Sequence, residues 1–75
     1  MPRVRKPDNY FEVNVRARML MRGLSPSEFA RKSKMSLPTL YTRFSCPKTL
    51  TLGELKTFSL ILSCTMSELM ENVKI

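Results

Sequence analysis

Apolar residues recur along this chain with the period of an α-helix. In the first such stretch they fall at i, i+4, i+7 and i+11, and they comprise Val13, Ala17, Leu20 and Leu24. The pattern predicts a helix from about Asn14 to Arg22, ended by Gly23 as a C′ glycine. The alternation of apolar and polar residues over 11–15 also permits a short strand before this helix.

The segment 25–44 has the pattern of two short helices joined by a tight turn. Ser25, Pro26 and Glu28 form a helix start, with a hydroxyl N-cap, a proline at the first position and a glutamate at the third. A polar break at 32–34 follows, and Ser36 caps the second helix. The inward positions are Phe29, Ala30, Leu40 and Phe44, and the outward positions of the second helix are Leu37, Pro38, Tyr41 and Thr42. Because such short helices are unstable alone in water, we expect a rigid helix-turn-helix unit that offers one exposed helix to a groove of DNA.

Two further capping boxes follow in the C-terminal part of the chain. Thr51-x-x-Glu54 predicts a helix to about Leu62, and Thr65-x-x-Glu68 predicts a short last helix. The expected inward residues are Leu52, Leu55, Phe58, Leu62 and Leu69, with Val73 as a further candidate. Three such starts ahead of helix-periodic segments indicate an all-α domain.

The composition limits the chain to one small domain with a modest core. Its 75 residues carry 13 Lys+Arg and 6 Asp+Glu, which gives a formal net charge of +7. Residues 1–48 hold 11 basic and 3 acidic side chains, whereas residues 49–75 hold 2 and 3. This asymmetry favours a polyanion-binding face joined to a separate packing part, and a solvated charged surface is the alternative.

The chain has no histidine, which removes histidine-dependent acid–base catalysis and most zinc sites. Two cysteines, Cys46 and Cys64, cannot complete a four-ligand metal site. We expect both to be reduced, with Cys64 in the core and Cys46 at a helix end. We therefore expect no enzyme activity, no cofactor and no metal. No targeting segment or membrane span is apparent, so the expected location is the cytoplasm, in association with the nucleoid.

Residues 1–9 are expected to form a flexible basic arm ahead of a single helix-turn-helix domain at residues 10–75. The arm contains Arg3, Arg5 and Lys6 together with two prolines, and it has no apolar period. Arms of this kind in DNA-binding domains follow a minor groove or the phosphates, and a terminus without a role is the alternative.

The order of these elements resembles the lambda-repressor/Cro-like (Xre) helix-turn-helix family. The phrases that carry the resemblance are Gly23-Leu24-Ser25, Phe29-Ala30, Met35-Ser36-x-x-Thr39-Leu40 and Leu62-Ser63-Cys64-Thr65-x-x-Glu68-Leu69, within about residues 13–70. It implies a compact five-helix, all-α, lambda-repressor-like domain with the helix-turn-helix at helices 2 and 3. It also implies a third helix in the major groove of double-stranded DNA, and a homodimer that reads two half-sites about one DNA turn apart. A shorter phrase, Thr39-Leu40-Tyr41-x-x-Phe44, is similar to the TetR family, but the chain has no room for that family's ligand-binding domain.

Three positions depart from the family pattern. Lys34 stands where the turn usually has glycine, at a cost of roughly 1 kcal/mol if the turn is left-handed. Met19 and Phe44 replace an Arg–Glu ion pair, so that both partners have become apolar. Arg43 occupies an inward position of the family, and we expect the third helix to be rotated or shortened so that Phe44 packs inward and Arg43 reaches phosphate.

The exposed face of the third helix supplies the candidate base-reading residues, namely Leu37, Pro38, Thr39, Tyr41 and Thr42. By resemblance, Leu37, Pro38 and Thr42 would face base edges. The candidate phosphate contacts are Ser27, Lys32, Lys34, Ser36, Arg43 and Lys48. Because this face lacks the common base readers Arg, Asn and Gln before Arg43, thymine methyl contacts and DNA shape would supply part of the specificity. The three arginines of the first helix, Arg16, Arg18 and Arg22, are more simply interpreted as a solvated face.

The leading hypothesis is a sequence-specific DNA-binding transcription regulator of bacterial or phage type, similar to Cro and the repressors, which occupies an operator as a homodimer and either represses or activates transcription. The first alternative is a protein-interaction module on the same fold, such as an antirepressor, for which the apolar Leu37 and Pro38 would form the contact patch. The second alternative is a protein that coats nucleic acid without sequence preference, motivated by the basic arm.

Overall fold

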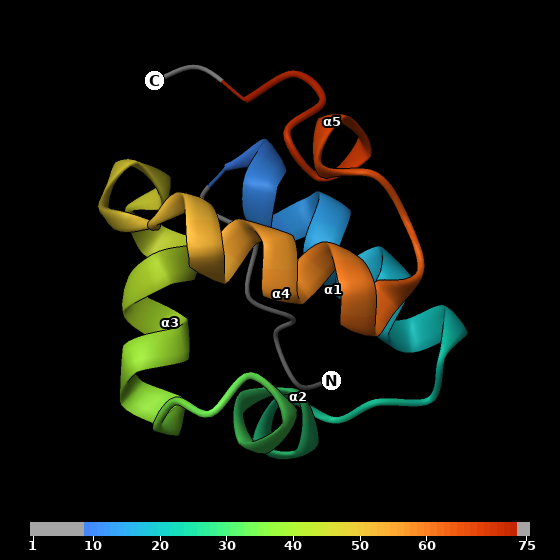
Figure 1. The fold of residues 1–75 in the computed structure, drawn as a ribbon, viewed down its shortest axis with the longest axis vertical. Helices are drawn as coiled ribbons and strands as arrows, with labels where there is room; N and C mark the ends of the chain where they lie inside the picture. The colour runs from blue at the N-terminus through green and yellow to red at the C-terminus, as the bar shows by residue number, and fades with distance from the viewer. Residues whose placement is uncertain (1–8, 74–75) are drawn as a thin grey trace, which may run out of the picture.

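Five α-helices and one short 3-10 helix make up the part of the chain that the computed structural model describes, residues 9–73. In chain order they are α1 Tyr10–Met21, α2 Pro26–Lys32, α3 Leu37–Ser45, η1 Pro47–Thr49, α4 Leu52–Leu62 and α5 Met66–Leu69. The five-helix, all-α fold predicted from the sequence is thereby confirmed. In Figure 1, α4 crosses in front of α1, with α2 on one side of this pair and α5 on the other.

Each α-helix begins at a polar N-cap whose side chain accepts a hydrogen bond from the first turn. The capping boxes predicted at Ser25, Thr51 and Thr65 are all present. In each, the glutamate side chain accepts a hydrogen bond from the N-cap backbone N–H. Ser36 caps α3 as predicted. The fifth cap, Asn9, accepts from the backbone N–H of Glu12 at 3.0 Å. These local hydrogen bonds explain why helices of 4–12 residues begin where they do.

The first helix starts earlier than predicted and buries a different face. It begins at Tyr10, so the alternative of a strand before it is wrong. The buried residues are Phe11, Val15 and Met19, whereas Val13 is 41% exposed and Leu20 81% exposed. This helix carries two apolar stripes at helical spacing, and periodicity alone does not select between them. The stripe that contains the large Phe11 ring is the one that faces the core.

Four phenylalanines, all that the chain contains, form the centre of the core. The ring of Phe58 lies 4.8 Å from that of Phe29 and 6.3 Å from that of Phe11, between ring centroids. The Phe11 ring in turn lies 6.5 Å from that of Phe44. The four rings come from α1, α2, α3 and α4, so this cluster fixes the relative positions of all four helices.

The C-terminal helices bear out most of the predicted inward positions. Phe58, Leu62 and Leu69 are buried, and Leu55 and Val73 are half-buried against the core. The prediction for Leu52 is wrong, because its side chain is 73% exposed. Leu52 is the first residue of α4 and lies at the end of the helix that borders a surface groove.

Side-chain hydrogen bonds tie α1 to segments far away in the sequence. The Asn9 amide donates to the carbonyl of Phe44 at 2.7 Å, so this residue belongs to the folded domain and not to the predicted arm. The Asn14 amide donates to the carbonyls of Leu69 and Glu71, each at 2.9 Å. The remainder of the predicted arm, with Arg3, Arg5 and Lys6, lies outside the described residues.

Candidate nucleic-acid interface

The turn between α2 and α3 gives the helix pair its geometry. Lys34 has a φ of 59°, in the left-handed region that favours glycine. The next residue, Met35, donates its backbone N–H to the carbonyl of Ala30 at 3.0 Å, which closes the end of α2. The turn therefore keeps a left-handed residue although its side chain is not glycine. Figure 1 shows α3 at one edge of the molecule, joined to α2 by this turn.

The outward face of α3 consists of small and apolar groups. Pro38 and Thr42 are exposed, and Tyr41 is 37% exposed. The Thr42 hydroxyl donates to the carbonyl of Pro38 at 3.0 Å, which leaves its oxygen as an acceptor. The expectation that Leu37 points outward is wrong in part, because this side chain is half-buried and packs against the core.

Hydrogen bonds at the start of α3 hold two further candidate residues. The Ser36 hydroxyl donates to the Thr39 hydroxyl at 2.8 Å and accepts from the Thr39 backbone N–H at 3.3 Å. Ser36 is exposed and Thr39 half-buried. Their first role is therefore to cap the helix, at the end nearest the turn.

Arg43 is held within the protein by its neighbours. Its Nε donates to Oε1 of Glu54 at 3.0 Å, and its Nη1 donates to the Thr49 hydroxyl at 3.4 Å. Phe44 is buried as predicted, and α3 continues past it to Ser45, so the expected shortening of the helix does not occur. The pKa of Glu54 is lowered, first by the hydrogen bond from the Thr51 backbone N–H and then by Arg43. Arg43 thus joins α3 to α4, and a contact to phosphate would have to use the edge of the guanidinium that this pair leaves free.

Of the other candidate phosphate contacts, Lys34 and Lys48 lie near the two ends of α3, whereas Lys32 and Ser27 belong to α2. Lys32 and Lys34 precede α3, Lys48 follows it in η1, and all three are exposed. Ser27 is exposed in the first turn of α2. The structure therefore brings basic side chains to both ends of a helix whose own outward face is nearly uncharged.

A cation beside α3 was missed by the sequence analysis. Arg16 of α1 places its Cζ 5.3 Å from the centre of the Phe44 ring and 5.9 Å from that of Tyr41. Its Nε donates to Oε2 of Glu12 at 2.7 Å, and this glutamate is only 2% exposed. The i,i+4 spacing of Glu12 and Arg16 was the available signal for the pair. The contact with α3 depends on how the two helices cross, which periodicity does not give.

Cys46 and Cys64 are free thiols, and burial raises the pKa of Cys64. Within residues 9–73 no group of three His, Cys, Asp or Glu side chains is placed to hold a metal ion. In the same range, no helix has the length and apolar character needed to cross a membrane.

Comparison with protein families gives one match that covers this interface. The model of the Cro/C1-type helix-turn-helix DNA-binding domain matches residues 14–74, which include α2, the turn and α3. Comparison with curated protein sequences and with solved structures gave no significant match.

Proposed function

The chain belongs to the Cro/C1-type helix-turn-helix DNA-binding domain family, and from this premise we propose that it is a sequence-specific transcription regulator, a repressor of bacterial or phage type. The observation that carries the proposal is the open outward face of α3 with exposed lysines at both ends. In this proposal α3 lies in the major groove, and Lys34 and Lys48 bind the phosphates on either side.

The base contacts follow from the chemistry of the α3 side chains. Pro38 would pack against thymine methyl groups, together with the part of Leu37 that is exposed. The Thr42 oxygen would accept from a cytosine or adenine amino group, and the Tyr41 hydroxyl would donate or accept one hydrogen bond. Such contacts discriminate weakly, so we expect DNA shape to contribute to specificity. Thr39, Ser36, Ser27, Lys32 and Arg43 complete the proposed DNA surface, with Arg3, Arg5 and Lys6 of the N-terminal segment.

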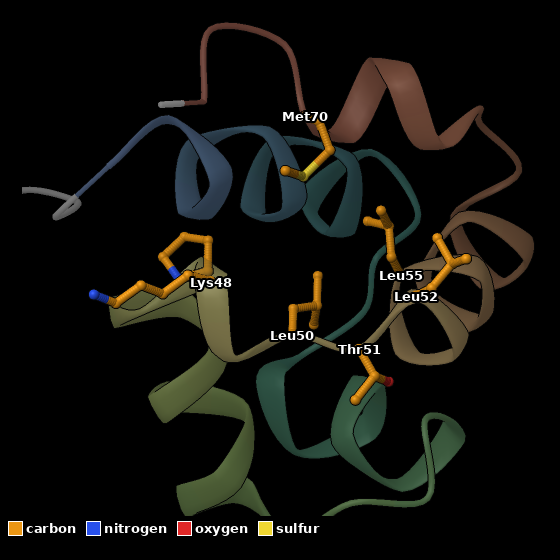
Figure 2. Close-up of a pocket in the computed structure, with 7 residues that line it drawn as sticks. Lys48, Leu50, Thr51, Leu52, Leu55 and Met70 are labelled. Atoms are coloured by element: carbon orange, nitrogen blue, oxygen red, sulfur yellow. The ribbon is translucent and has the colours of Figure 1, made fainter. Parts of the chain in front are cut away.

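We further propose that the protein binds DNA as a homodimer through an apolar groove beside the end of α3. The groove is lined by Pro47, Lys48, Leu50, Thr51, Leu52, Leu55 and Met70. Figure 2 shows Leu50, Leu55 and Met70 facing a common hollow, with Leu52 at its rim. Its lining includes one ionisable side chain, and residues 49–75 are nearly neutral, so little charge repulsion opposes a second copy. Because only Cys46 separates α3 from η1, a dimer formed here would join the two copies near the C-terminal ends of their α3 helices.

Selection of binding sites from a random duplex library near physiological salt tests the proposal. We expect a two-fold symmetric motif with half-sites about 10 base pairs apart. Single substitutions at Thr42 and Pro38 should change the preferred bases, whereas Lys48→Gln should weaken binding to all sequences equally. Failure to bind any duplex in a salt-dependent manner would overturn it.

One observation favours the alternative of a protein-interaction module. The outward face of α3 lacks Asn and Gln, and its one arginine, Arg43, is engaged with Glu54. If the library yields no motif and a pull-down returns a stoichiometric protein partner that Pro38→Glu releases, the antirepressor type of function is the better conclusion.

A further inference from the structure

The guanidinium of Arg16 is fixed at the junction between α1 and α3. Glu12 holds it from one side through the 2.7 Å hydrogen bond to Nε. The rings of Phe44 and Tyr41 lie beside it at 5.3 and 5.9 Å, within the range of a cation–π contact. The two rings also contact each other edge to face, with centroids 6.3 Å apart. A long and normally mobile side chain is therefore held in one place by three neighbours.

The hydrogen-bonding capacity of this guanidinium is only partly used. Glu12 engages Nε, and within the part of the chain that the structure describes, the terminal Nη1 and Nη2 groups donate to no protein atom. The Arg16 side chain is 37% exposed, whereas that of Glu12 is 3% exposed. The carboxylate of Glu12 is thus buried, whereas the Arg16 side chain is partly exposed at the surface.

The position of Tyr41 places these donors next to the proposed DNA surface. This ring belongs to the outward face of α3 and is partly exposed, while Phe44 beneath it is buried. Bases in a groove are bordered by backbone phosphates. A cation that contacts the flank of a groove-reading tyrosine therefore lies where a phosphate would be expected.

We propose that Arg16 is a DNA-phosphate contact, held in place by Glu12 and the two rings. The inference rests on the proposed function of α3. Two parallel N–H groups of a guanidinium match the oxygens of a phosphate, and here the side chain is already ordered before DNA arrives. Because Glu12 engages only Nε, the two Nη groups stay available to a ligand outside the protein. Arg16 is thereby distinguished from Arg18, whose Nη2 bonds to Glu68 away from α3.

The salt dependence of duplex binding tests this assignment. Fluorescence anisotropy would measure affinity between about 50 and 200 mM salt for the selected duplex. Removal of one phosphate contact should lower the slope of log K against log salt by about 0.9 and weaken binding to unrelated duplexes equally. The variant is Glu12→Gln/Arg16→Met, which leaves the net charge unchanged and leaves no buried carboxylate without its partner.

Three controls separate this role from a purely structural one. Arg22→Met makes the same substitution at the C-cap of α1 and removes one net charge, yet its slope should stay that of the wild type. Glu12→Gln alone should keep the slope, because the cation remains. Glu12→Gln/Arg16→Lys should restore most of it. Thermal melting of each variant detects loss of folding as a lower melting temperature. A variant that is only less stable should keep the wild-type slope of log K against log salt, measured at a temperature where it is folded.

The outcomes distinguish the two proposals. A wild-type slope for the double variant, or an equal loss in Arg22→Met, overturns the role of Arg16 and leaves the proposed function intact. Absence of duplex binding by the wild-type protein overturns both. A reduced slope confined to the Arg16 variants supports both.

Discussion

Lys34 adopts a backbone conformation that is unfavourable for a residue with a Cβ atom. Its φ of 59° lies in the left-handed region, where a Cβ crowds the following carbonyl oxygen. The turn nevertheless keeps this shape, because buried residues on both helices, Phe29 and Leu40 among them, require the helix pair to meet at this angle. The cost of the conformation is therefore met by packing elsewhere in the molecule.

Lys34→Gly should raise the free energy of unfolding by about 1 kcal/mol, because glycine adopts this conformation without steric cost. Urea unfolding would measure the change. Lys34→Ala is the matched control, since it removes the same charge and retains a Cβ, and it should give no gain. Equal effects of the two substitutions would show that the lysine side chain, and not the backbone, determines the result.

Three glutamates make the stability of the fold depend on pH in the acidic range. The pKa values of Glu28, Glu54 and Glu68 are lowered, in each case first by a hydrogen bond from the N-cap backbone of the same capping box. Because these folded-state pKa values lie below the unfolded value, the stabilisation is complete above about pH 4.3 and is lost as pH falls through the folded-state values.

We therefore expect the free energy of unfolding to be constant from neutral pH to about pH 5 and to fall below about pH 4. Urea unfolding at a series of pH values would measure this. Glu54→Gln should lose stability at neutral pH and lose less than the wild type on further acidification. A flat profile down to pH 3 would contradict the assignment.

At the scale of the elements, the N-caps determine where the short helices begin. In α4 the Thr51 hydroxyl accepts from the Glu54 backbone N–H at 3.0 Å, and the Glu54 carboxylate accepts from the Thr51 backbone N–H at 2.9 Å. The same carboxylate holds Arg43 of α3. The start of α4 is therefore also a joint between two helices.

Thr51→Ala should lower the free energy of unfolding by about 1 kcal/mol, within a range of about 0.5–2, because the first turn of α4 loses its acceptor. Thr57→Ala is the matched control on the same helix. The Thr57 hydroxyl donates only to the carbonyl of Gly53 in the preceding turn, so its loss should hardly change the free energy of unfolding. Thermal or urea unfolding of both variants would measure the difference, and equal losses would contradict the capping role.

The starts of α2, α4 and α5 could be predicted from the sequence because a capping box is a local motif of four residues. The buried face of α1 could not, since the Val13–Leu20 and Phe11–Met19 stripes have equally good periodicity and only the neighbouring helices decide between them. The same reason applies to Leu52, which is apolar yet lies at the outer end of α4. Lys34 and Lys48 could be proposed as phosphate contacts from their charge and their place beside the predicted DNA-reading helix. The position of Arg16 against Tyr41 depends on the crossing of α1 and α3, which no local pattern encodes.

At the scale of the whole molecule, the two proposed surfaces lie on adjoining parts of one small domain. The exposed face of α3 and the groove of Figure 2 are joined by η1, which contributes Lys48 to both. Binding of a second copy and binding of DNA are therefore expected to reinforce each other, because the dimer presents two copies of α3 to one duplex.

Leu52→Gln should weaken dimer formation without unfolding the monomer, because this side chain is 73% exposed and borders the groove. Affinity for a duplex with two half-sites should fall about tenfold or more, and affinity for one half-site should stay unchanged. Sedimentation and duplex titration would measure both. Leu60→Gln is the matched control, at a 70% exposed leucine of the same helix outside the groove. Equal effects of the two variants would remove the groove from the proposed interface.

The hydrogen bonds of Asn9 and Asn14 have a consequence for the order of events on the ribosome. The first helix of this domain and its N-cap are bonded to the carbonyls of Phe44, Leu69 and Glu71, all of which are synthesised later. The buried ring of Phe11 also packs against the ring of Phe58, which is synthesised later. One or two helices alone lack these partners, so we expect the domain to fold in one step once α5 has left the exit tunnel. Until then, the nascent chain exposes its apolar residues to chaperones and proteases.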